Sequence, residues 1–441
     1  MNLRRTLAAT LGALLAFGAG ACGDDASDAP EAVKLLVFGA PDELAAYRTL
    51  ADAYGKARSG AQVQLVEASD RKDLITKLST SIAGGAPPDV FLMNYRFYGQ
   101  FAAKDAIEPL DSRISGSKAF NKADYYPAAM QAFAWKGKQL CLPQNMSSLA
   151  VYYNKTLFQK YGVAEPKAGW TWNDLVATAS ALTRDAAGVP IRGAETEGAV
   201  RKPAVHGLGI EASVLRLAPF VWSNGGDIVD NPQKPTRLTF DNERARAVLK
   251  NLIDLRSAYG VVPTDEEVEA ENDEARFQNG RLAMLMNSRR VTTTFRSITA
   301  FEWDVAPIPT YGQAANVLHS DAYCMTRGSK NKDATWRFME FAFSPEGQRI
   351  MAATGRTVPS HMATANSPAF LGPSQPPRTA KVFLDAVTGI RALPTISTWP
   401  EIEDVTGGIL ENALYRGDKL DDVIRQLDEQ TRPLFARGES P

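Results

Sequence analysis

The residue with the most definite chemistry in this sequence is Cys22, which directly follows the small residues Ala19-Gly20-Ala21. Two arginines and a short apolar stretch precede it, so residues 1–21 have the pattern of a cleaved export signal. A cysteine placed directly after such a run is typical of a lipidation site, although Ala19 stands where that motif more often has Leu. We therefore expect residues 1–21 to be a lipoprotein signal peptide and Cys22 to carry the lipid. The alternative is an ordinary cleaved signal with an incidental cysteine.

Residues 22–32 are mostly small or acidic and include a proline. Such a segment buries too little apolar surface to fold, so we expect a flexible tether. Two acyl chains on one cysteine suffice for stable membrane attachment. The sequence therefore predicts an exported protein that its lipid holds at the outer face of the cell membrane or in the periplasm.

Two further cysteines, Cys141 and Cys324, each lie in a short apolar run typical of a strand. If lipid consumes the thiol of Cys22, these two remain as a pair in an oxidising compartment. The sequence leaves two interpretations open. The pair forms a disulfide, or the two thiols stay unconnected and behave as small hydrophobic side chains.

Little in the sequence points to catalysis, a metal site or a cofactor. The three histidines, His206, His319 and His361, lack the spacing of zinc ligands. No nucleophile elbow or phosphate-binding loop occurs, and one loose glycine-rich match at 207–212 is a weak signal. Carboxylates are plentiful, so a surface glycoside hydrolase stays open as the enzyme alternative. We expect a protein that is not an enzyme, with no catalytic residue, no metal and no cofactor.

An acidic run covers residues 265–274. A calcium loop would need a glycine and a ligand spacing that this run lacks. We therefore expect a solvated helix face.

The 441-residue chain has a formal net charge of −1 and no basic run interleaved with aromatic residues. Its charge therefore gives no reason to expect a nucleic-acid partner. No second apolar run approaches the length of a membrane span, so membrane contact is expected through the lipid alone. Roughly four hundred residues follow the tether, more than one hydrophobic core usually serves, which favours two lobes in one monomer.

Strands and helices alternate at the start of the mature chain. Residues 33–38 form an apolar run typical of a strand that is covered on both faces, residues 61–66 are the next expected strand, and residues 89–93 are the third. Apolar positions recur at helical spacing between these runs, and Asp70 is placed to cap the second helix. The βαβαβ order predicts an open parallel sheet whose ligand site lies beyond the carboxyl ends of its strands. The candidate loops are residues 39–42 and 94–98.

Later segments continue the alternation. Thr171, Asp241 and Ser344 each precede a segment with helical periodicity, so we expect helices to begin there. Strand and helix patterns thus recur in both halves, and the expected fold class is α/β.

Short motifs along the chain resemble, in order and spacing, the family 1 extracellular solute-binding proteins of ABC importers, the maltose-binding-protein class. Each motif is weak by itself, but together they cover nearly the whole mature chain. They are residues 85–91 (GAPPDVF), 136–143 (KGKQLCLP), 152–158 (YYNKTLF), 169–175 (GWTWNDL), 223–227 (SNGGD), 277–284 (FQNGRLAM), 331–338 (NKDATWRF), 344–348 (SPEGQ) and 355–359 (GRTVP).

The resemblance implies a two-lobed periplasmic-binding-protein-like fold with a hinge and a ligand cleft between the lobes. The chain would cross between lobes at 142–144, at 321–323 and within 368–377. Lobe 1 would comprise residues 31–142 plus 324–369, and lobe 2 residues 143–323 plus 378–437. Cys141 and Cys324 would then lie on neighbouring hinge strands.

The resemblance also implies which side chains line the cleft. Trp222 and Tyr95 are the expected aromatic plates for a sugar ring; a core position is the alternative for Trp222. In the family the second crossing often carries a glycine pair, where this chain has Ser320-Asp321. The expected ligand-binding residues are Asn94, Tyr95, Arg96, Gln144, Asn145, Ser147, Glu211, Trp222, Asn224, Gly225, Asn287, Arg289, His319, Asp321 and Arg356.

The function that this resemblance implies is capture of a carbohydrate by hinge closure and its delivery to an ABC permease. Amides and carboxylates beside arginines suit the hydroxyl groups of a mono- or oligosaccharide, which both donate and accept hydrogen bonds. The several arginines leave an alternative open, an anionic ligand such as a glycerol phosphate or a sugar acid.

Overall fold

The structure is a computed structural model, and it describes residues 32–191, 202–372 and 374–441. The predicted signal peptide, Cys22 and the tether up to residue 31 lie outside the described residues. Within the described part of the chain, no helix is long and apolar enough to cross a membrane.

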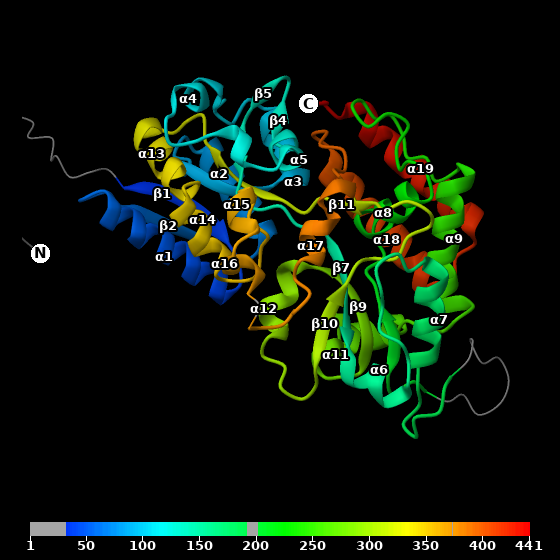
Figure 1. Ribbon diagram of the computed structural model, residues 1–441. Coiled ribbons are helices and arrows are strands. Elements are labelled where there is room, and N and C mark those ends of the chain that lie inside the picture. Colours follow the sequence, from blue (N-terminus) through cyan, green and yellow to red (C-terminus); the bar gives the residue numbers. More distant parts are fainter. Residues whose placement is uncertain (1–31, 192–201, 373) are drawn as a thin grey trace, which may run out of the picture.

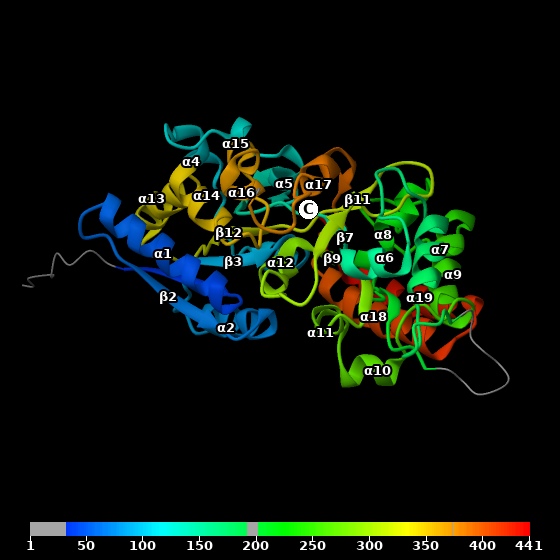
Figure 2. The same cartoon turned by 60° about the horizontal axis from the view of Figure 1, so that its bottom comes forward.

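Two lobes lie side by side, each around its own sheet (Figures 1 and 2). In lobe 1 the strand order is β2-β1-β3-β12-β6. Strand β1 pairs in parallel with β2 and β3, whereas β12 runs antiparallel to β3 and β6. The predicted parallel βαβαβ unit is thus confirmed. The strands are β1 (Val33–Phe38), β2 (Val63–Ala68), β3 (Val90–Asn94), β6 (Cys141–Pro143) and β12 (Asp321–Met325).

Amphipathic helices cover the sheet of lobe 1. The longest of them, α1, buries Tyr47, Leu50 and Tyr54 on one stripe, as its helical spacing predicts. Elements from the far end of the chain, α13 and α14, pack beside α1. The elements of this region are α1 (Pro41–Ala57), α2 (Arg71–Ala83), α3 (Tyr95–Ala102), α4 (Asp111–Gly116), η1 (Lys122–Asp124), α5 (Pro127–Gln131), β4 (Ala134–Trp135), β5 (Lys138–Gln139), α13 (Lys332–Ala342) and α14 (Pro345–Ala352).

Lobe 2 is built around a four-stranded sheet with the order β10-β7-β9-β8. Strand β7 runs antiparallel to both neighbours, and β8 runs parallel to β9. Nearly every residue of these strands is buried, because helices cover the sheet. The strands are β7 (Leu149–Asn154), β8 (His206–Gly209), β9 (Leu282–Ser288) and β10 (Trp303–Ala306).

Helices from the middle and the end of the chain cover lobe 2, and α18 packs between α9 and α19. The elements of this region, which include two short strands, are α6 (Lys155–Tyr161), α7 (Trp172–Leu182), α8 (Val214–Ser223), α9 (Glu243–Ser257), α10 (Asp265–Ala270), α11 (Asp273–Gln278), η2 (Arg289–Val291), α12 (Thr292–Phe295), β11 (Asn316–Val317), α17 (Val382–Asp385), η3 (Ala386–Gly389), β13 (Ile390–Arg391), α18 (Trp399–Arg416) and α19 (Leu420–Arg437). Helices α15 (Met362–Ala365) and α16 (Pro368–Leu371) lie beside α14 of lobe 1.

The chain passes between the two sheets next to a disulfide. Cys141 on β6 faces Cys324 on β12, with their Cα atoms 4.3 Å apart, and the two are bonded. The structure therefore contains the disulfide and not two free thiols.

The predicted lobe boundaries stay a prediction. Val358, Ala365 and Phe370 already pack in the apolar cluster of the lobe 2 sheet.

Most of the predicted helix starts are confirmed. The side chains of Asp70, Thr171 and Ser344 each accept a hydrogen bond from a backbone N–H of the helix that follows. Asp241 also precedes a helix as predicted, with Asn242 as the cap of α9. The expected loop 94–98 is a correction: Asn94 caps α3, which begins at Tyr95.

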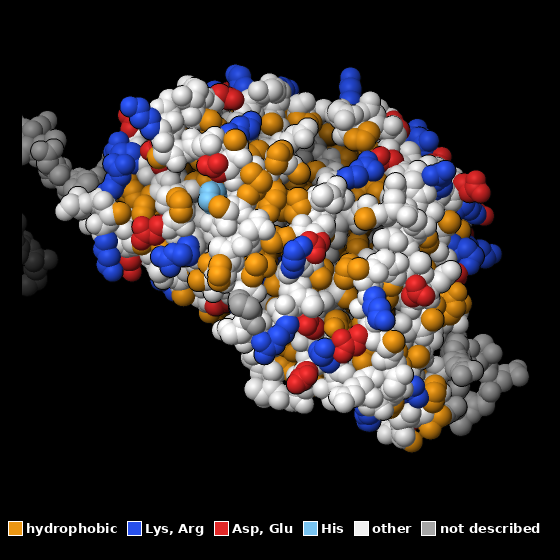
Figure 3. Space-filling model, viewed as in Figure 1, with side chains coloured by type: hydrophobic (Ala, Val, Ile, Leu, Met, Phe, Trp, Pro, Cys, Tyr) orange, Lys and Arg blue, Asp and Glu red, His pale blue; other side chains and the backbone are white. Residues whose placement is uncertain are grey.

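Charged side chains of both signs are scattered over the surface, and hydrophobic ones gather around the junction of the lobes on the face in Figure 3. Among the described residues, the exposed large hydrophobic side chains are Val189 and Tyr259. A surface of this kind fits a protein that buries its apolar residues in its own cores.

Candidate ligand-binding cleft

Two adjoining cavities open where the lobes meet. The first, called the cleft from here on, has a volume of about 580 Å³ and is lined from both lobes. The second, called the acidic pocket, has about 590 Å³ and lies in lobe 2. They share the side chains of Glu211, Ala212, Arg216, Arg290 and Glu411, so they lie next to each other.

Lobe 1 presents aromatic rings and a guanidinium to the cleft from the carboxyl ends of its strands. Phe38 ends β1, Arg71 begins α2 and Phe97 lies in the first turn of α3. The Arg71 guanidinium stacks 5.0 Å from the Phe97 ring and 5.6 Å from the Phe38 ring. No carboxylate pairs with Arg71 among the described residues, and its Nε is buried without a hydrogen-bond acceptor. Burial lowers the pKa of Arg71, and the neighbouring Arg96 lowers it further.

An ion pair links the two lobes across the cleft. Arg96 of α3 contacts Glu403 of α18, and both side chains are mostly buried. The indole N–H of Trp399 holds the second oxygen of Glu403 at 2.8 Å. Arg96 is therefore neutralised and positioned by a residue of the other lobe.

Lobe 2 contributes a second arginine that is almost fully buried. Arg216 of α8 is 3 % exposed and lies 3.1 Å from the Glu211 carboxylate. Arg216 also approaches Nε2 of His319 at 3.4 Å. Burial and the surrounding arginines hold the pKa of His319 well below its usual range, so its Nε2 is free to accept a hydrogen bond. Arg216 holds the pKa of Glu211 below its usual value.

The remaining cleft arginines are also paired with carboxylates. Arg290 contacts Glu274, to which Asn287 also donates at 3.1 Å. Arg356 lies 2.7 Å from Glu43, whose pKa burial raises to about 7 against the opposing effect of Arg356. Because every cleft arginine except Arg71 lies beside a carboxylate, the cleft offers donors and acceptors side by side.

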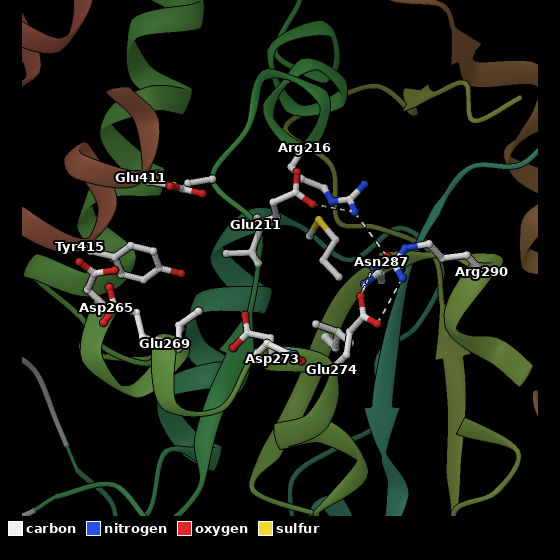
Figure 4. Close-up of a pocket in the computed structure, with 16 residues that line it drawn as sticks. Glu211, Arg216, Asp265, Glu269, Asp273, Glu274, Asn287, Arg290, Glu411 and Tyr415 are labelled. Atoms are coloured by element: carbon white, nitrogen blue, oxygen red, sulfur yellow. Dashed lines mark hydrogen bonds and ion pairs between the residues drawn. The ribbon is translucent and has the colours of Figure 1, made fainter. Parts of the chain in front are cut away.

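Figure 4 shows the acidic pocket, with carboxylates on several sides of one space and the two arginines on the side toward the cleft. The expectation that the acidic run 265–274 is merely a solvated helix face is therefore corrected. Side chains from this run line the cavity, namely Asp265, Glu269, Asp273 and Glu274. Within the described ranges, no group of His, Cys, Asp or Glu is arranged to hold a metal ion.

Some of the predicted site residues meet at these cavities. Arg96, Glu211, His319 and Arg356 line the cleft. Asn287 lines the acidic pocket, as Glu211 also does.

A second group of predicted residues holds the crossings together instead. Asn94 and Asn145 both donate to Asp321, at 3.1 and 3.4 Å. Gln144 donates to the hydroxyl of Tyr323 at 2.8 Å, and Ser147 pairs through its backbone with His319. The acidic side chain at the second crossing thus binds neighbouring amides, and these residues line neither cavity.

The predicted aromatic plates are wrong for this structure. Trp222 is 2 % exposed, donates its indole N–H to Asp227 and stacks under Arg391. Tyr95 is fully buried against Phe133. Both point into the apolar core because helices α8 and α3 turn these positions inward.

The predicted residues Asn224, Gly225 and Arg289 also lie away from the cavities. Asn224 and Gly225 contact Arg244 at the end of α8. Arg289 is buried over the rings of Phe370 and Phe383 and donates to the carbonyl oxygen of Gly355. The arginine that reaches the cleft is its neighbour Arg290, because consecutive residues of the helical turn η2 point in different directions.

Sequence reasoning missed several lining side chains. Phe38 ends the first predicted strand and Phe97 lies in the predicted loop 94–98, but neither residue was predicted to bind the ligand. Arg71 directly follows the predicted cap Asp70. Sequence reasoning offered only Trp399 as a weaker cleft candidate at the start of α18. The side chains of α18 that line the cleft are Glu403, Asp404, Gly407 and Glu411, and Tyr415 lines the acidic pocket.

The profile of the bacterial extracellular solute-binding proteins matches residues 49–371. The chain belongs to this family. The solute-binding protein is 24 % identical over 354 residues to a binding protein of Brucella abortus (strain 2308), a match that covers 80 % of each chain.

Solved structures share the fold of this solute-binding protein. An ABC substrate-binding protein from Listeria monocytogenes, in complex with cycloalternan, matches with a TM-score of 0.81 and 24 % identity, over 92 % of this chain and 98 % of that one. UgpB from Mycobacterium tuberculosis, in complex with glycerophosphocholine, matches with a TM-score of 0.77 and 18 % identity, over 92 % and 99 %. The expected two-lobed α/β fold is thereby confirmed.

Proposed function

We propose that this solute-binding protein is the receptor of an ABC importer, that it captures a carbohydrate in the cleft and that it delivers this ligand to the permease. The observation that carries the proposal is a cavity of about 580 Å³ that both lobes line with paired donors and acceptors. A ligand of saccharide size fits such a volume.

The polar lining matches the hydroxyl groups of a sugar. Each hydroxyl donates one hydrogen bond and accepts others, and the pairs Arg96–Glu403, Arg216–Glu211 and Arg356–Glu43 present both functions within a few ångströms. The apolar face of a sugar ring would lie against Phe38 or Phe97, which line the cleft from lobe 1.

Capture by hinge closure follows from the position of the cleft between the lobes. A ligand that contacts both lobes stabilises the closed state only by its higher affinity for that state. We propose that the protein acts as a monomer without catalytic activity, and that the lipid on Cys22 holds it at the outer face of the membrane or in the periplasm.

The test is a thermal-shift screen of the purified protein against mono-, di- and oligosaccharides. A ligand that binds only the folded state raises the unfolding temperature. A sugar should do so and should be recovered unchanged after prolonged incubation. If no sugar raises the temperature, the carbohydrate proposal fails; if the sugar is cleaved, the protein belongs to the hydrolase alternative.

Variants locate the site. Phe97→Ala should weaken the binding of a hit by roughly 1–3 kcal/mol, the scale of losing a large apolar contact. Tyr259→Ala is the matched control, because Tyr259 is an exposed aromatic residue outside both cavities. Equal affinities for wild type and Phe97→Ala would place the ligand elsewhere.

One observation favours an anionic ligand as the second candidate. Arg71 faces the cleft without a carboxylate partner, unlike Arg96, Arg216 and Arg356. A phosphate or a carboxylate of the ligand would complete this pair. If so, calorimetry with a sugar phosphate should show binding that falls as salt rises and that Arg71→Gln largely abolishes. Unchanged affinity in Arg71→Gln would exclude this candidate.

A further inference from the structure

The acidic pocket has no role in the capture of a neutral sugar as proposed above. Its carboxylates come from four parts of lobe 2 and surround one space in Figure 4. Glu211 precedes α8, Asp265 and Glu269 lie on α10, Asp273 and Glu274 lie on α11, and Glu411 lies on α18.

Half of these six carboxylates have no ion pair with a described residue. Glu211 pairs with Arg216 and Glu274 with Arg290, the arginines that border the cleft. Glu269, Asp273 and Glu411 form no ion pair with any described residue, and Asp265 has only a distant one with Arg416 at 3.8 Å. The pocket thus has a basic side toward the cleft and an uncompensated acidic interior.

Asp273 provides a separate indication that a donor is missing. Its side chain lines the cavity in Figure 4, and the backbone N–H of Ile210 donates to the carboxylate, but its Oδ1 is buried and has no hydrogen-bond partner. A buried carboxylate oxygen without a donor is costly and rare in folded proteins. An N–H donor that enters the pocket with the ligand would satisfy it.

Tyr415 adds an aromatic ring to the wall of the same space. Carboxylates next to an aromatic ring are the surroundings that an organic ammonium group prefers, through ion pairing and through attraction to the ring. A bare metal ion fits less well, because within the described residues no side chains are arranged to hold one.

We propose that the acidic pocket binds a protonated amine of the ligand, so that the solute taken up is an amino sugar or a basic oligosaccharide derivative. This inference rests on the proposed carbohydrate function and narrows its substrate class. The neutral part of the ligand lies in the cleft, and its amine passes Glu211 and Glu411, which line both cavities.

The test compares matched sugars by calorimetry. The probes are glucosamine, N-acetylglucosamine and glucose, together with the disaccharide series of each in α and β linkage. In at least one series the free amine should bind about tenfold or more tightly than both its N-acetylated and its neutral counterpart. If no sugar of any kind binds, the proposed carbohydrate function fails. If neutral sugars bind and every amine counterpart binds no better, only the ammonium inference fails.

Variants decide whether the pocket is responsible. Glu269→Gln and Asp273→Asn change residues that line the acidic pocket but not the cleft. Each should weaken binding of the amine by about tenfold and leave the affinity for a neutral counterpart within about twofold. Glu269 forms no ion pair with a described residue and Asp273 has a raised pKa, so neither change should unfold the protein, which circular dichroism checks. Glu266→Gln is the control, because Glu266 lies on α10 outside the pocket. Retention of amine affinity in both pocket variants would overturn the inference.

Discussion

At the scale of single residues, the arginines of the cleft differ in whether the protein supplies a carboxylate that pairs with the guanidinium. Arg96, Arg216 and Arg356 each have a carboxylate partner, so a ligand exchanges hydrogen bonds with an existing pair. Arg71 stacks on two aromatic rings without such a partner. An anionic group of the ligand would therefore gain most binding free energy at Arg71. A hydroxyl group can form hydrogen bonds equally well with the paired arginines.

Trp222 allows a prediction that separates a core residue from a ligand contact. Because Trp222 is buried, Trp222→Ala should lower the free energy of unfolding by about 3–5 kcal/mol, the usual cost of such a cavity. Urea denaturation measures this loss. Ligand affinity at a temperature where the variant is still folded should be unchanged. A folded variant of normal stability that fails to bind would restore Trp222 as a ligand contact.

Asp273 gives a pH dependence whose sign can be worked out. Burial raises its pKa to about 6, from 3.8 for an ordinary Asp, with Arg276 opposing and Glu274 adding to the increase; Tyr415 of α18 faces the same group. Between pH 3.8 and about 6 the folded state keeps a proton that the unfolded chain has lost. This group therefore lowers stability as pH rises through that window.

Replacement of Asp273 should remove this contribution. Relative to wild type, Asp273→Asn should gain up to about 3 kcal/mol in the free energy of unfolding between pH 4 and pH 7, without ligand. Urea titrations of both proteins at several pH values measure the difference. Glu266→Gln should show no such trend. A difference that is constant with pH would mean that Asp273 titrates normally.

At the scale of elements, the junction of the lobes depends on strands and helices that are distant in sequence. Strands β6 and β12 are joined by Cys141 and Cys324, which are 183 positions apart, and α3 contacts α18 through Arg96 and Glu403. The disulfide holds two strands of the lobe 1 sheet together beside the crossings, whereas the ion pair joins the two lobes and should restrict how they move.

The disulfide should matter for stability. A crosslink over so long a loop restricts the unfolded chain, so the double variant Cys141→Ala/Cys324→Ala should be roughly 2–5 kcal/mol less stable. Mass spectrometry of a digest without reductant should find the two peptides linked. Free thiols at both positions in the exported protein would contradict the bond.

The connection between α3 and α18 should influence opening. Loss of Glu403 leaves Arg96 buried without a counterion, which favours exposure of Arg96 to water. Glu403→Gln should therefore shift the unliganded protein toward larger radii of gyration in small-angle X-ray scattering. Glu401→Gln is the control, because Glu401 pairs with Arg437 at the surface. Equal scattering from both variants would show that the ion pair does not hold the lobes together.

At the scale of the whole molecule, the predicted anchor determines where the receptor works. Cys22→Ala should move the protein from the membrane fraction to the soluble fraction, because the proposed anchor is a lipid on this one thiol. Immunoblots of the two fractions measure this change, and ligand affinity of the soluble form should equal that of wild type. A variant that stays with the membrane would contradict lipid anchoring at Cys22.

The sequence by itself determined the family, the parallel βαβαβ unit and most helix caps, because these depend on local order. Apolar runs, helical periodicity and capping residues such as Asp70, Thr171 and Ser344 act within a few positions of one another. The sequence allowed the disulfide as one of two alternatives, since only two cysteines remain to pair after Cys22.

Only the tertiary structure decided which polar and aromatic side chains face the ligand. Arg289 and Arg290 are neighbours, yet one is buried over Phe370 and the other reaches the cleft. Trp222 was predicted to stack against a sugar ring, but its side chain is buried in the core. Side-chain direction at a strand end or helix turn depends on how distant elements pack, and α18 reaches the cleft only because it packs on lobe 2. No local pattern carries that information, because it arises from contacts between residues hundreds of positions apart.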